Sequence, residues 1–191
     1  MSGISAAVAA ARQGADVVLI NDRPVLGGNA SSEIRVTVNG VQTLKAKNPV
    51  ERETGIIEEI LLENKKYNPQ ESYPIWDHVL YDYVVRQPNL RLMLNTQAIK
   101  AIMDGERIKS AFCWQSTTET EVVINAKIFV DCSGDGLFAA TSGAEYRTGR
   151  EGKAEFGEKY APDEPDGWMM GESIMMITKD MGRPVPFYPP S

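Results

Sequence analysis

The opening stretch of the chain, MSGISAAVAAARQGADVVLINDRPVLGGNASSE at residues 1–33, decides the fold class. Small residues, Gly3 among them, recur on one side of residues 2–14, and this spacing predicts a helix that lies close against a sheet or a ligand. The apolar, β-branched run at residues 16–22 predicts a buried parallel strand. Residues 25–33 are too rich in Gly, Asn and Ser for regular structure, so we expect a ligand-facing loop.

The middle of the chain predicts two helices and then a series of strands. Apolar side chains at helical spacing predict amphipathic helices at residues 49–68 and 73–89. The segments with the composition of strands are residues 90–95, 98–105, 107–116, 118–127 and 128–133, with a hairpin turn at 104–107. The last segment is mostly apolar and runs through Ser-Gly-Asp-Gly into a helix predicted at residues 137–143. We therefore expect it to share a parallel sheet with the strand near the N-terminus.

This order of elements predicts an α/β protein with a partial Rossmann-like, doubly wound layer. Residues 1–34 and 127–150 are expected to form that layer. Residues 35–126 are expected to be an inserted helical pair with a mostly antiparallel β-sheet. Residues 151–191 are charged, then rich in Gly and Met, and end in prolines, which indicates an extended segment.

The first helix fits the end of a dinucleotide-binding fingerprint. In the pattern G-x-G-x-x-G a strand leads into the glycines, and the last glycine lies in the helix that follows. Gly3 fits that last glycine, so the strand and the first two glycines would lie before Met1. We therefore expect an incomplete chain whose first strand is missing.

Composition narrows the partners of the protein. With 42% hydrophobic residues among 191 the chain can build a core, and its formal charge of −6 argues against nucleic acid. Cys113 and Cys132 lack CxxC spacing and the single histidine is His78, so no metal site is expected. The cysteines, and His78 with Trp76 near it, are expected to be packing residues.

Location is only weakly indicated by the sequence. No apolar run approaches the roughly 20 residues of a membrane span, and the N-terminus lacks the basic region of a signal peptide. A cytoplasmic location is slightly favoured, and an export signal upstream of Met1 stays open. The expected partners are a small-molecule substrate and, through open sheet edges, a second copy of the chain.

Three motifs carry a resemblance to a known family. They are VVLINDRPVLGGNASSEIR at residues 17–35, FVDCSGDG at 129–136 and GAEYRTGREGKAEFGE at 143–158. Together they resemble the FAD-dependent oxidoreductases of the glutathione-reductase-like flavoprotein group, and more narrowly a branch common in Bacteroides-type and planctomycete bacteria. The resemblance covers essentially the whole chain. It implies FAD as the cofactor, and it implies that a complete member continues past Ser191.

The resemblance also assigns a ribose-binding position at the end of the N-terminal strand. Asn21 stands where the family usually has Glu, whose carboxylate accepts hydrogen bonds from both ribose hydroxyls of the AMP half. Asn can accept one such bond. The neighbours Asp22 and Arg23 are expected to share the role.

The loop LGGNASS at residues 26–32 is the most specific candidate cofactor site. Gly27 and Gly28 would let the backbone approach the pyrophosphate or the ribityl chain. The residues whose amides and hydroxyls could donate to anionic oxygen are Asn29, Ala30, Ser31 and Ser32. An ordinary polar turn is the alternative.

The run from residue 128 through Ser-Gly-Asp-Gly into the predicted helix is a second strand-to-loop-to-helix crossing, after the one that follows the N-terminal strand. The resemblance places Ser133, Gly134 and Asp135 of this second crossing beside the cofactor, and it places Gln97 and Ala98 near the adenine. For the second crossing, a tight turn that needs glycine is the alternative. The charged residues Arg147, Arg150 and Glu155 fit either a site for an anionic substrate or a solvated face, and the solvated face is favoured.

The function that follows is oxidation or reduction of a small organic substrate through FAD by hydride transfer. No catalytic residue can be assigned from the sequence. One alternative is a non-catalytic flavin- or nucleotide-binding module or a truncated inactive product. Another is a nicotinamide enzyme, against which the LGG loop argues, because an ordinary NAD fold places no such loop after its second strand.

Overall fold

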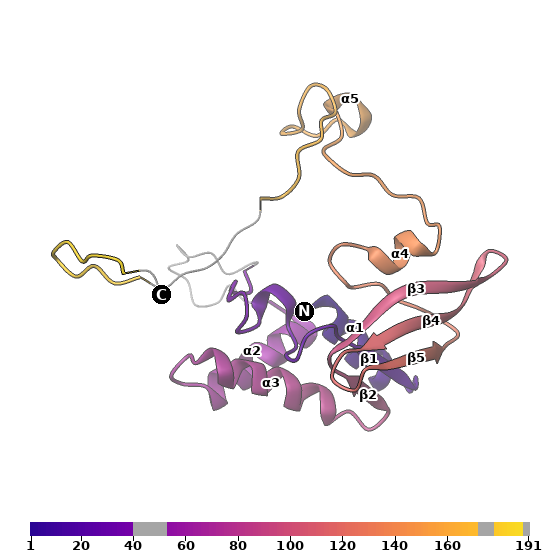
Figure 1. The fold of residues 1–191 in the computed structure, drawn as a ribbon, viewed down its shortest axis with the longest axis horizontal. Coiled ribbons are helices and arrows are strands. Elements are labelled where there is room, and N and C mark those ends of the chain that lie inside the picture. The colour runs from indigo at the N-terminus through magenta and orange to yellow at the C-terminus, as the bar shows by residue number, and fades with distance from the viewer. Residues whose placement is uncertain (40–52, 172–177, 189–191) are drawn as a thin grey trace.

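The structure is a computed structural model that describes residues 1–39, 53–171 and 178–188. It confirms a mixed α/β fold, consistent with a partial Rossmann-like FAD-binding domain (Figure 1). The helices are α1 (Ser2–Arg12), the 3-10 turn η1 (Gly28–Ala30), α2 (Gly55–Tyr67), α3 (Tyr73–Val85), α4 (Leu137–Thr141) and α5 (Lys153–Phe156). The strands are β1 (Val17–Ile20), β2 (Leu90–Met93), β3 (Thr96–Asp104), β4 (Arg107–Gln115) and β5 (Thr120–Asn125).

The first sheet is a parallel pair. β1 pairs with β2 in register, with Val17 opposite Leu90 and Ile20 opposite Met93. Parallel strands need a long crossover between them, and α2 and α3 occupy it. Residues 90–93 therefore lie in the same layer as the N-terminal strand, although their sequence resembles the antiparallel strands that follow. The predicted helix at 49–68 starts at Gly55 within the described residues, and positions 49–52 lie outside them.

The second sheet is antiparallel, in the order β3-β4-β5. Asp104 pairs with Arg107 across the tight turn, which confirms the predicted hairpin, and Gly105 supplies the positive φ of 59° that the turn requires. A small core lies between this sheet and α4, where Phe129 and Phe138 have ring centroids 5.7 Å apart.

Residues 128–133 do not form the predicted strand. Ile128 and Val130 are 78% and 68% exposed, and no strand among the described residues pairs with this segment. The prediction of a shared sheet with residues 17–21 is therefore wrong for this part of the chain. An extended segment becomes a strand only where a neighbouring backbone takes its hydrogen bonds, and here none does.

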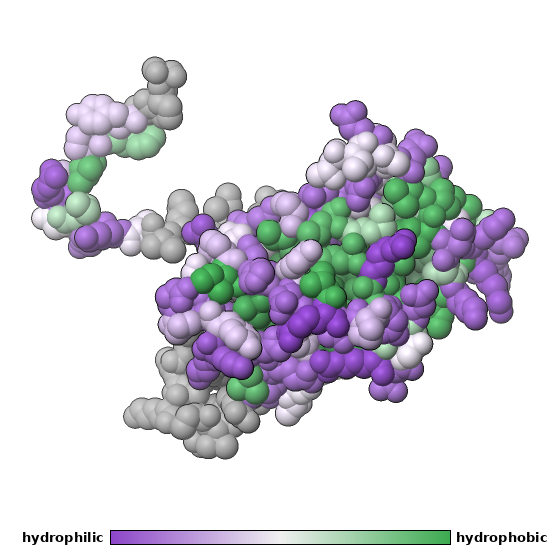
Figure 2. All heavy atoms as spheres, turned by 90° about the horizontal axis from the view of Figure 1, so that it is seen from below, coloured by the Kyte–Doolittle hydropathy of each residue, from purple (hydrophilic) through white to green (hydrophobic). Residues whose placement is uncertain are grey.

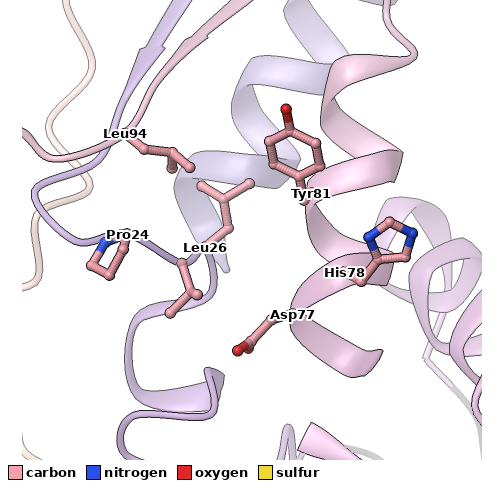
Figure 3. A pocket seen from close by; sticks show the side chains of 7 residues that line it. Pro24, Leu26, Asp77, His78, Tyr81 and Leu94 are labelled. Carbon is pink, nitrogen blue, oxygen red and sulfur yellow. The ribbon is translucent and has the colours of Figure 1, made fainter. Parts of the chain in front are cut away.

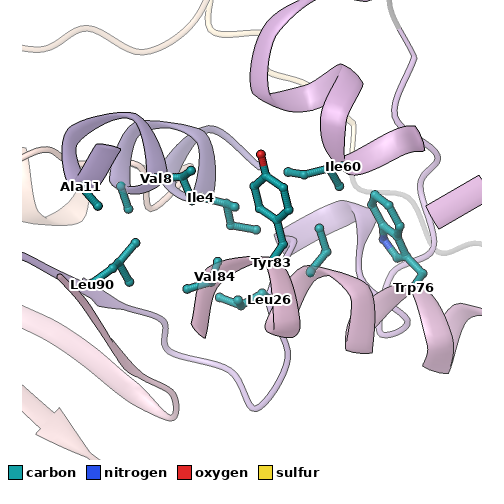
Figure 4. Close-up of a cluster of buried hydrophobic side chains, with 11 residues drawn as sticks. Ile4, Val8, Ala11, Leu26, Ile60, Trp76, Tyr83, Val84 and Leu90 are labelled. Carbon is teal, nitrogen blue, oxygen red and sulfur yellow. The ribbon is translucent and has the colours of Figure 1, made fainter. Parts of the chain in front are cut away.

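The main core lies between α1, α2, α3 and the parallel pair (Figure 4). Its buried side chains are Ile4, Ala7, Val8, Ala11, Leu26, Ile60, Trp76, Leu80, Tyr83, Val84 and Leu90. Leu26, which is 2% exposed, belongs to the loop that follows β1 and anchors the start of that loop in the core. On the surface, Figure 2 shows hydrophobic side chains gathered on the half of the molecule that carries the sheets.

A polar tie at the edge of the core joins the three long helices. The Arg12 guanidinium donates to both carboxylate oxygens of Glu59, at 2.9 and 2.7 Å, and to the Tyr83 hydroxyl at 2.9 Å. The Tyr83 hydroxyl donates to Glu59 at 2.6 Å. The hydrogen bonds from Arg12 and Tyr83 lower the pKa of Glu59 to about 2. Burial and the Glu59 carboxylate raise the pKa of Tyr83 to about 12.

The chain after α4 forms a small projecting turn that carries α5 (Figure 1). Arg150 and Asp166 exchange two backbone hydrogen bonds, at 3.0 and 3.1 Å, and also form a side-chain ion pair. Gly149 is required there, because a Cβ at this position would lie 2.1 Å from the Asp166 carbonyl oxygen. Residues 178–188 contain no helix or strand.

Candidate functional site

The end of β1 forms one wall of the candidate site. The Asn21 side-chain amide donates to the carbonyl oxygens of Arg23 and Val25, both at 2.9 Å, and so folds the chain back just after the strand. A carboxylate could not make these two bonds, because it has no donor. These two bonds use the side-chain nitrogen of Asn21 and leave its side-chain oxygen available as an acceptor. Asp22 and Arg23 are exposed, and Arg23 pairs with Glu33 at 3.0 Å.

The residues expected near adenine lie beside this wall. The backbone N–H of Thr96 donates to the Asn21 carbonyl at 2.8 Å, which joins the start of β3 to the end of β1. Gln97 and Ala98 follow directly on β3, opposite Trp114 and Cys113 of β4. Gln97 is exposed and Ala98 is half-buried. The structure therefore brings the ribose and adenine candidates together, although they are far apart in sequence.

The glycine-rich loop has an inner and an outer side. Gly27 is buried with φ at 114°, and Ser31 is fully buried. The amides of Ala30 and Ser31 donate to the carbonyls of Gly27 and Gly28, and the Ser32 amide donates to Asp77. These three N–H groups are therefore already used inside the protein. Gly28 and Asn29 are exposed, and they form the outer side together with the half-buried Ser32 side chain.

A pocket of about 210 Å³ lies between this loop and α3 (Figure 3). It is lined by Pro24, Val25, Leu26, Asp77, His78, Tyr81 and Leu94. His78 is exposed here, so its expected role as a packing residue is wrong. The helix turns Trp76 and Asp77 toward the loop and leaves His78 at the surface.

The second crossing is a turn at residues 131–136 that leads into α4. Asp131 accepts from the Ser133 and Ala139 amides, each at 2.9 Å. Partial burial opposes ionisation of Asp131, but these backbone hydrogen bonds outweigh it and hold its pKa below the usual value. Ser133, Gly134 and Asp135 are exposed, and a Cβ at Gly134 would meet no atom within 4 Å.

At Gly3 the first helix packs closely against β1 and against the turn at residues 131–136. A Cβ at Gly3 would lie 3.3 Å from the Cys132 Cβ and 3.8 Å from a Leu19 methyl. Close packing of this kind is what the last glycine of the fingerprint provides. Cys113 is buried as expected, whereas Cys132 is exposed and the packing prediction for it is wrong.

The charged residues beyond α4 are paired with one another. Arg147 forms two hydrogen bonds to Glu155, at 3.0 and 2.7 Å, and Arg150 pairs with Asp166. The side chain of Arg147 is 69% exposed. This arrangement matches a solvated face, which the sequence favoured.

Comparison with known families shows to which protein family the chain belongs. A sequence model of the family described as FAD dependent oxidoreductase matches residues 1–187. The chain belongs to this family. No curated protein and no solved structure matched the chain in the corresponding comparisons. In the parts of the chain that the structure describes, no helix is long and apolar enough to cross a membrane.

Members of this family depend on FAD, and the residues present fit the nucleotide. Gly28, like Gly134, borders open space, since a Cβ at either position would meet nothing within 4 Å. The Asn21 side-chain oxygen is not used by its two hydrogen bonds to the chain after β1, and Gln97 is exposed. Two residues of the site had little sequence signal: Asp131 stood out only as a charge in an apolar run, and Asp77 had no signal at all.

Proposed function

We propose that the chain contributes the nucleotide-binding part of a flavin oxidoreductase that transfers a hydride to or from a small organic substrate. One observation carries the proposal: the parallel strands β1 and β2 end beside Asn21 and the start of β3, and the loop that follows β1 contains Gly28, which faces open space. Ligands of α/β layers bind at the carboxyl ends of parallel strands. The narrower placement in the glutathione-reductase-like group is part of the proposal.

In this proposal the chain's own residues bind and orient the nucleotide. The Asn21 amide oxygen accepts from the ribose, and the backbone of Gln97 and Ala98 faces the adenine. Gly28 and Asn29 approach the pyrophosphate or ribityl chain, and Ser133, Gly134 and Asp135 border the cofactor from the second crossing. FAD supplies the hydride chemistry when bound.

The proposal extends to self-association of the chain. Among the described residues β1 pairs with β2 alone, and the apolar residues Ile128 and Val130 are exposed. An unpaired strand edge and exposed apolar side chains both favour association with a second copy of the chain. Sedimentation of the protein over a range of concentrations checks this, and a monomer at all concentrations contradicts it.

A matched pair of glycine variants tests the cofactor site. Gly28 and Gly105 both have φ at 59° and both face open space, so Gly28→Val and Gly105→Val carry similar backbone strain. We expect Gly28→Val to weaken FAD binding at least tenfold and Gly105→Val to leave it within twofold, measured by quenching of flavin fluorescence. Equal binding by both variants would remove the loop from the site. Anaerobic bleaching of bound flavin by candidate reductants then separates an oxidoreductase from a binding module.

A further inference from the structure

One face of α3 runs along the back of the glycine-rich loop. The residues of this face are Tyr73, Trp76, Asp77 and Leu80, which follow the i, i+3, i+4, i+7 spacing of a single helical stripe. The ends of the stripe contact the loop in opposite sequence order, Leu80 near Gly27 and Tyr73 at Arg35, so the loop runs roughly antiparallel to the helix. Figure 3 shows Asp77 pointing toward the loop.

Each position of the stripe contacts a different loop residue. A Cβ at Gly27 would lie 2.9 Å from a Leu80 methyl. Asp77 accepts from the Ser32 amide at 2.9 Å. The contacts at the other end of the stripe are Trp76 Nε1 donating to the Ala30 carbonyl at 2.7 Å and the Tyr73 hydroxyl donating to the Arg35 carbonyl at 2.9 Å.

The Trp76 hydrogen bond is buried and the Asp77 hydrogen bond is partly buried. Trp76 is 7% exposed and Asp77 is 9% exposed. Hydrogen bonds in such surroundings are strong, and one that involves a carboxylate is stronger still. Both act on main-chain groups of the loop, so they restrain its backbone whatever the loop side chains are. Exposed residues of the same helix, such as Tyr81, form no hydrogen bond to the loop among the described residues.

We infer that Trp76 and Asp77 are positioning residues that hold the backbone of residues 27–35 in the conformation that receives the cofactor. Both contact the loop from the α3 side, so their proposed effect on the cofactor acts through the loop backbone. Their effect is to order the loop before binding, which reduces the entropy lost when FAD binds. This inference rests on the proposed function for its consequence, but the ordering of the loop can be measured without FAD.

The test compares Asp77→Ala, Asp77→Asn and Asp82→Ala in the intact protein. Asn keeps an oxygen that can accept from the Ser32 amide, so it is the conservative rescue. Asp82 is the matched control, because it lies on the same helix, pairs with Arg86 and does not line the pocket beside the loop. Two quantities are measured: deuterium exchange of the Ser32 amide without flavin, and the dissociation constant of FAD. Thermal melting reports whether each variant is folded.

We expect Asp77→Ala to speed exchange at Ser32 and raise the FAD dissociation constant, each about tenfold. Asp77→Asn should stay within about threefold of the original protein and Asp82→Ala within about twofold. Unchanged exchange in Asp77→Ala, or equal losses in Ala and Asn, would overturn the inference. If Asp77→Ala fails to fold, Trp76→Phe, which removes the N–H donor together with part of the ring system, takes its place with the same expectation for a variant that thermal melting shows to be folded. Absence of FAD binding by the original protein would count against the proposed function, while the exchange data still decide the ordering.

Discussion

The loop at residues 27–35 and the turn at residues 131–136 look alike in sequence but are held by different hydrogen bonds. Each follows an apolar run and is rich in Gly and Ser. The loop at residues 27–35 starts from the buried Leu26 and is held along its back by α3. The turn at residues 131–136 is exposed, and its hydrogen bonds come from Asp131 and Ser133 within the same short segment.

This difference shows where the rigidity of a glycine-rich loop comes from. Glycines permit the backbone conformation, but they do not enforce it. In the loop at residues 27–35 the backbone conformation is enforced through Trp76 and Asp77 of α3, a helix that is distant in sequence but adjacent in space. In the turn at residues 131–136 the supporting groups are local, so that turn is expected to open more easily than the loop.

The largest expected effect separates two glycines with similar backbone strain. Gly27 has φ at 114° and a Cβ there would lie 2.9 Å from Leu80, whereas Gly134 has φ at 94° and faces open space. Gly27→Ala should lower the free energy of unfolding by about 3 kcal/mol, from strain and overpacking together. Gly134→Ala should cost about 1 kcal/mol from strain alone. Urea unfolding measures both, and equal losses would contradict the idea that only one crossing is tightly packed.

The second prediction concerns the fold-back after β1. Asn21→Asp keeps the size of the side chain but removes both donors and turns a carboxylate toward the Arg23 and Val25 carbonyls. We expect a loss of about 2 kcal/mol in the free energy of unfolding. Asp22→Asn, at the exposed neighbouring position, should change it by less than about 0.5 kcal/mol. Full stability of Asn21→Asp in urea unfolding would show that these bonds do not hold the loop.

Much of this fold could be predicted from the sequence, because many of its elements depend on the spacing of nearby residues and on turn residues. The helices α1 and α3 and the β3–β4 hairpin follow from spacing and turn residues, and the structure confirms them. Residues 128–133 have the composition of a strand, yet a strand also needs a neighbour, which composition cannot reveal. For the same reason the parallel pairing of β2 was missed, since its partner lies some 70 residues earlier in the chain.

The glycines of the candidate site could be predicted from the sequence, but the side chains that hold its loop in place could not. Gly28 and Gly134 have the positive φ and open surroundings that their sequence context indicates. Asn21 was read as a ribose ligand, but its side-chain N–H groups also fold the chain after β1. Asp77 lies 45 positions from the loop amide that it binds, so no local pattern could connect them.

The third prediction tests the locally supported crossing. Asp131→Ala removes the acceptor of the Ser133 and Ala139 amides and should cost about 1 kcal/mol. The loss should be centred on the turn and α4, because both amides that Asp131 accepts from belong to them. Deuterium exchange should therefore rise at Ala139 and stay unchanged at Ser32, with Asp135→Ala as the exposed control. A rise at both amides would contradict the separation of the two crossings.

The smallest effect comes from the polar tie among the three long helices. One of these helices, α3, also holds the loop at residues 27–35. Glu59 has its pKa lowered to about 2, against about 4.3 for an unfolded chain. Its contribution is therefore fully present above about pH 5 and is lost as pH falls toward 2. The Arg12–Glu59 pair is largely exposed, so solvent screening limits the contribution to about 0.5–1 kcal/mol. The stability difference between the original protein and Glu59→Gln should be constant near neutrality and shrink across this acid range. A difference that persists at pH 2 would mean that Glu59 acts through packing and that the tie among the helices is not ionic.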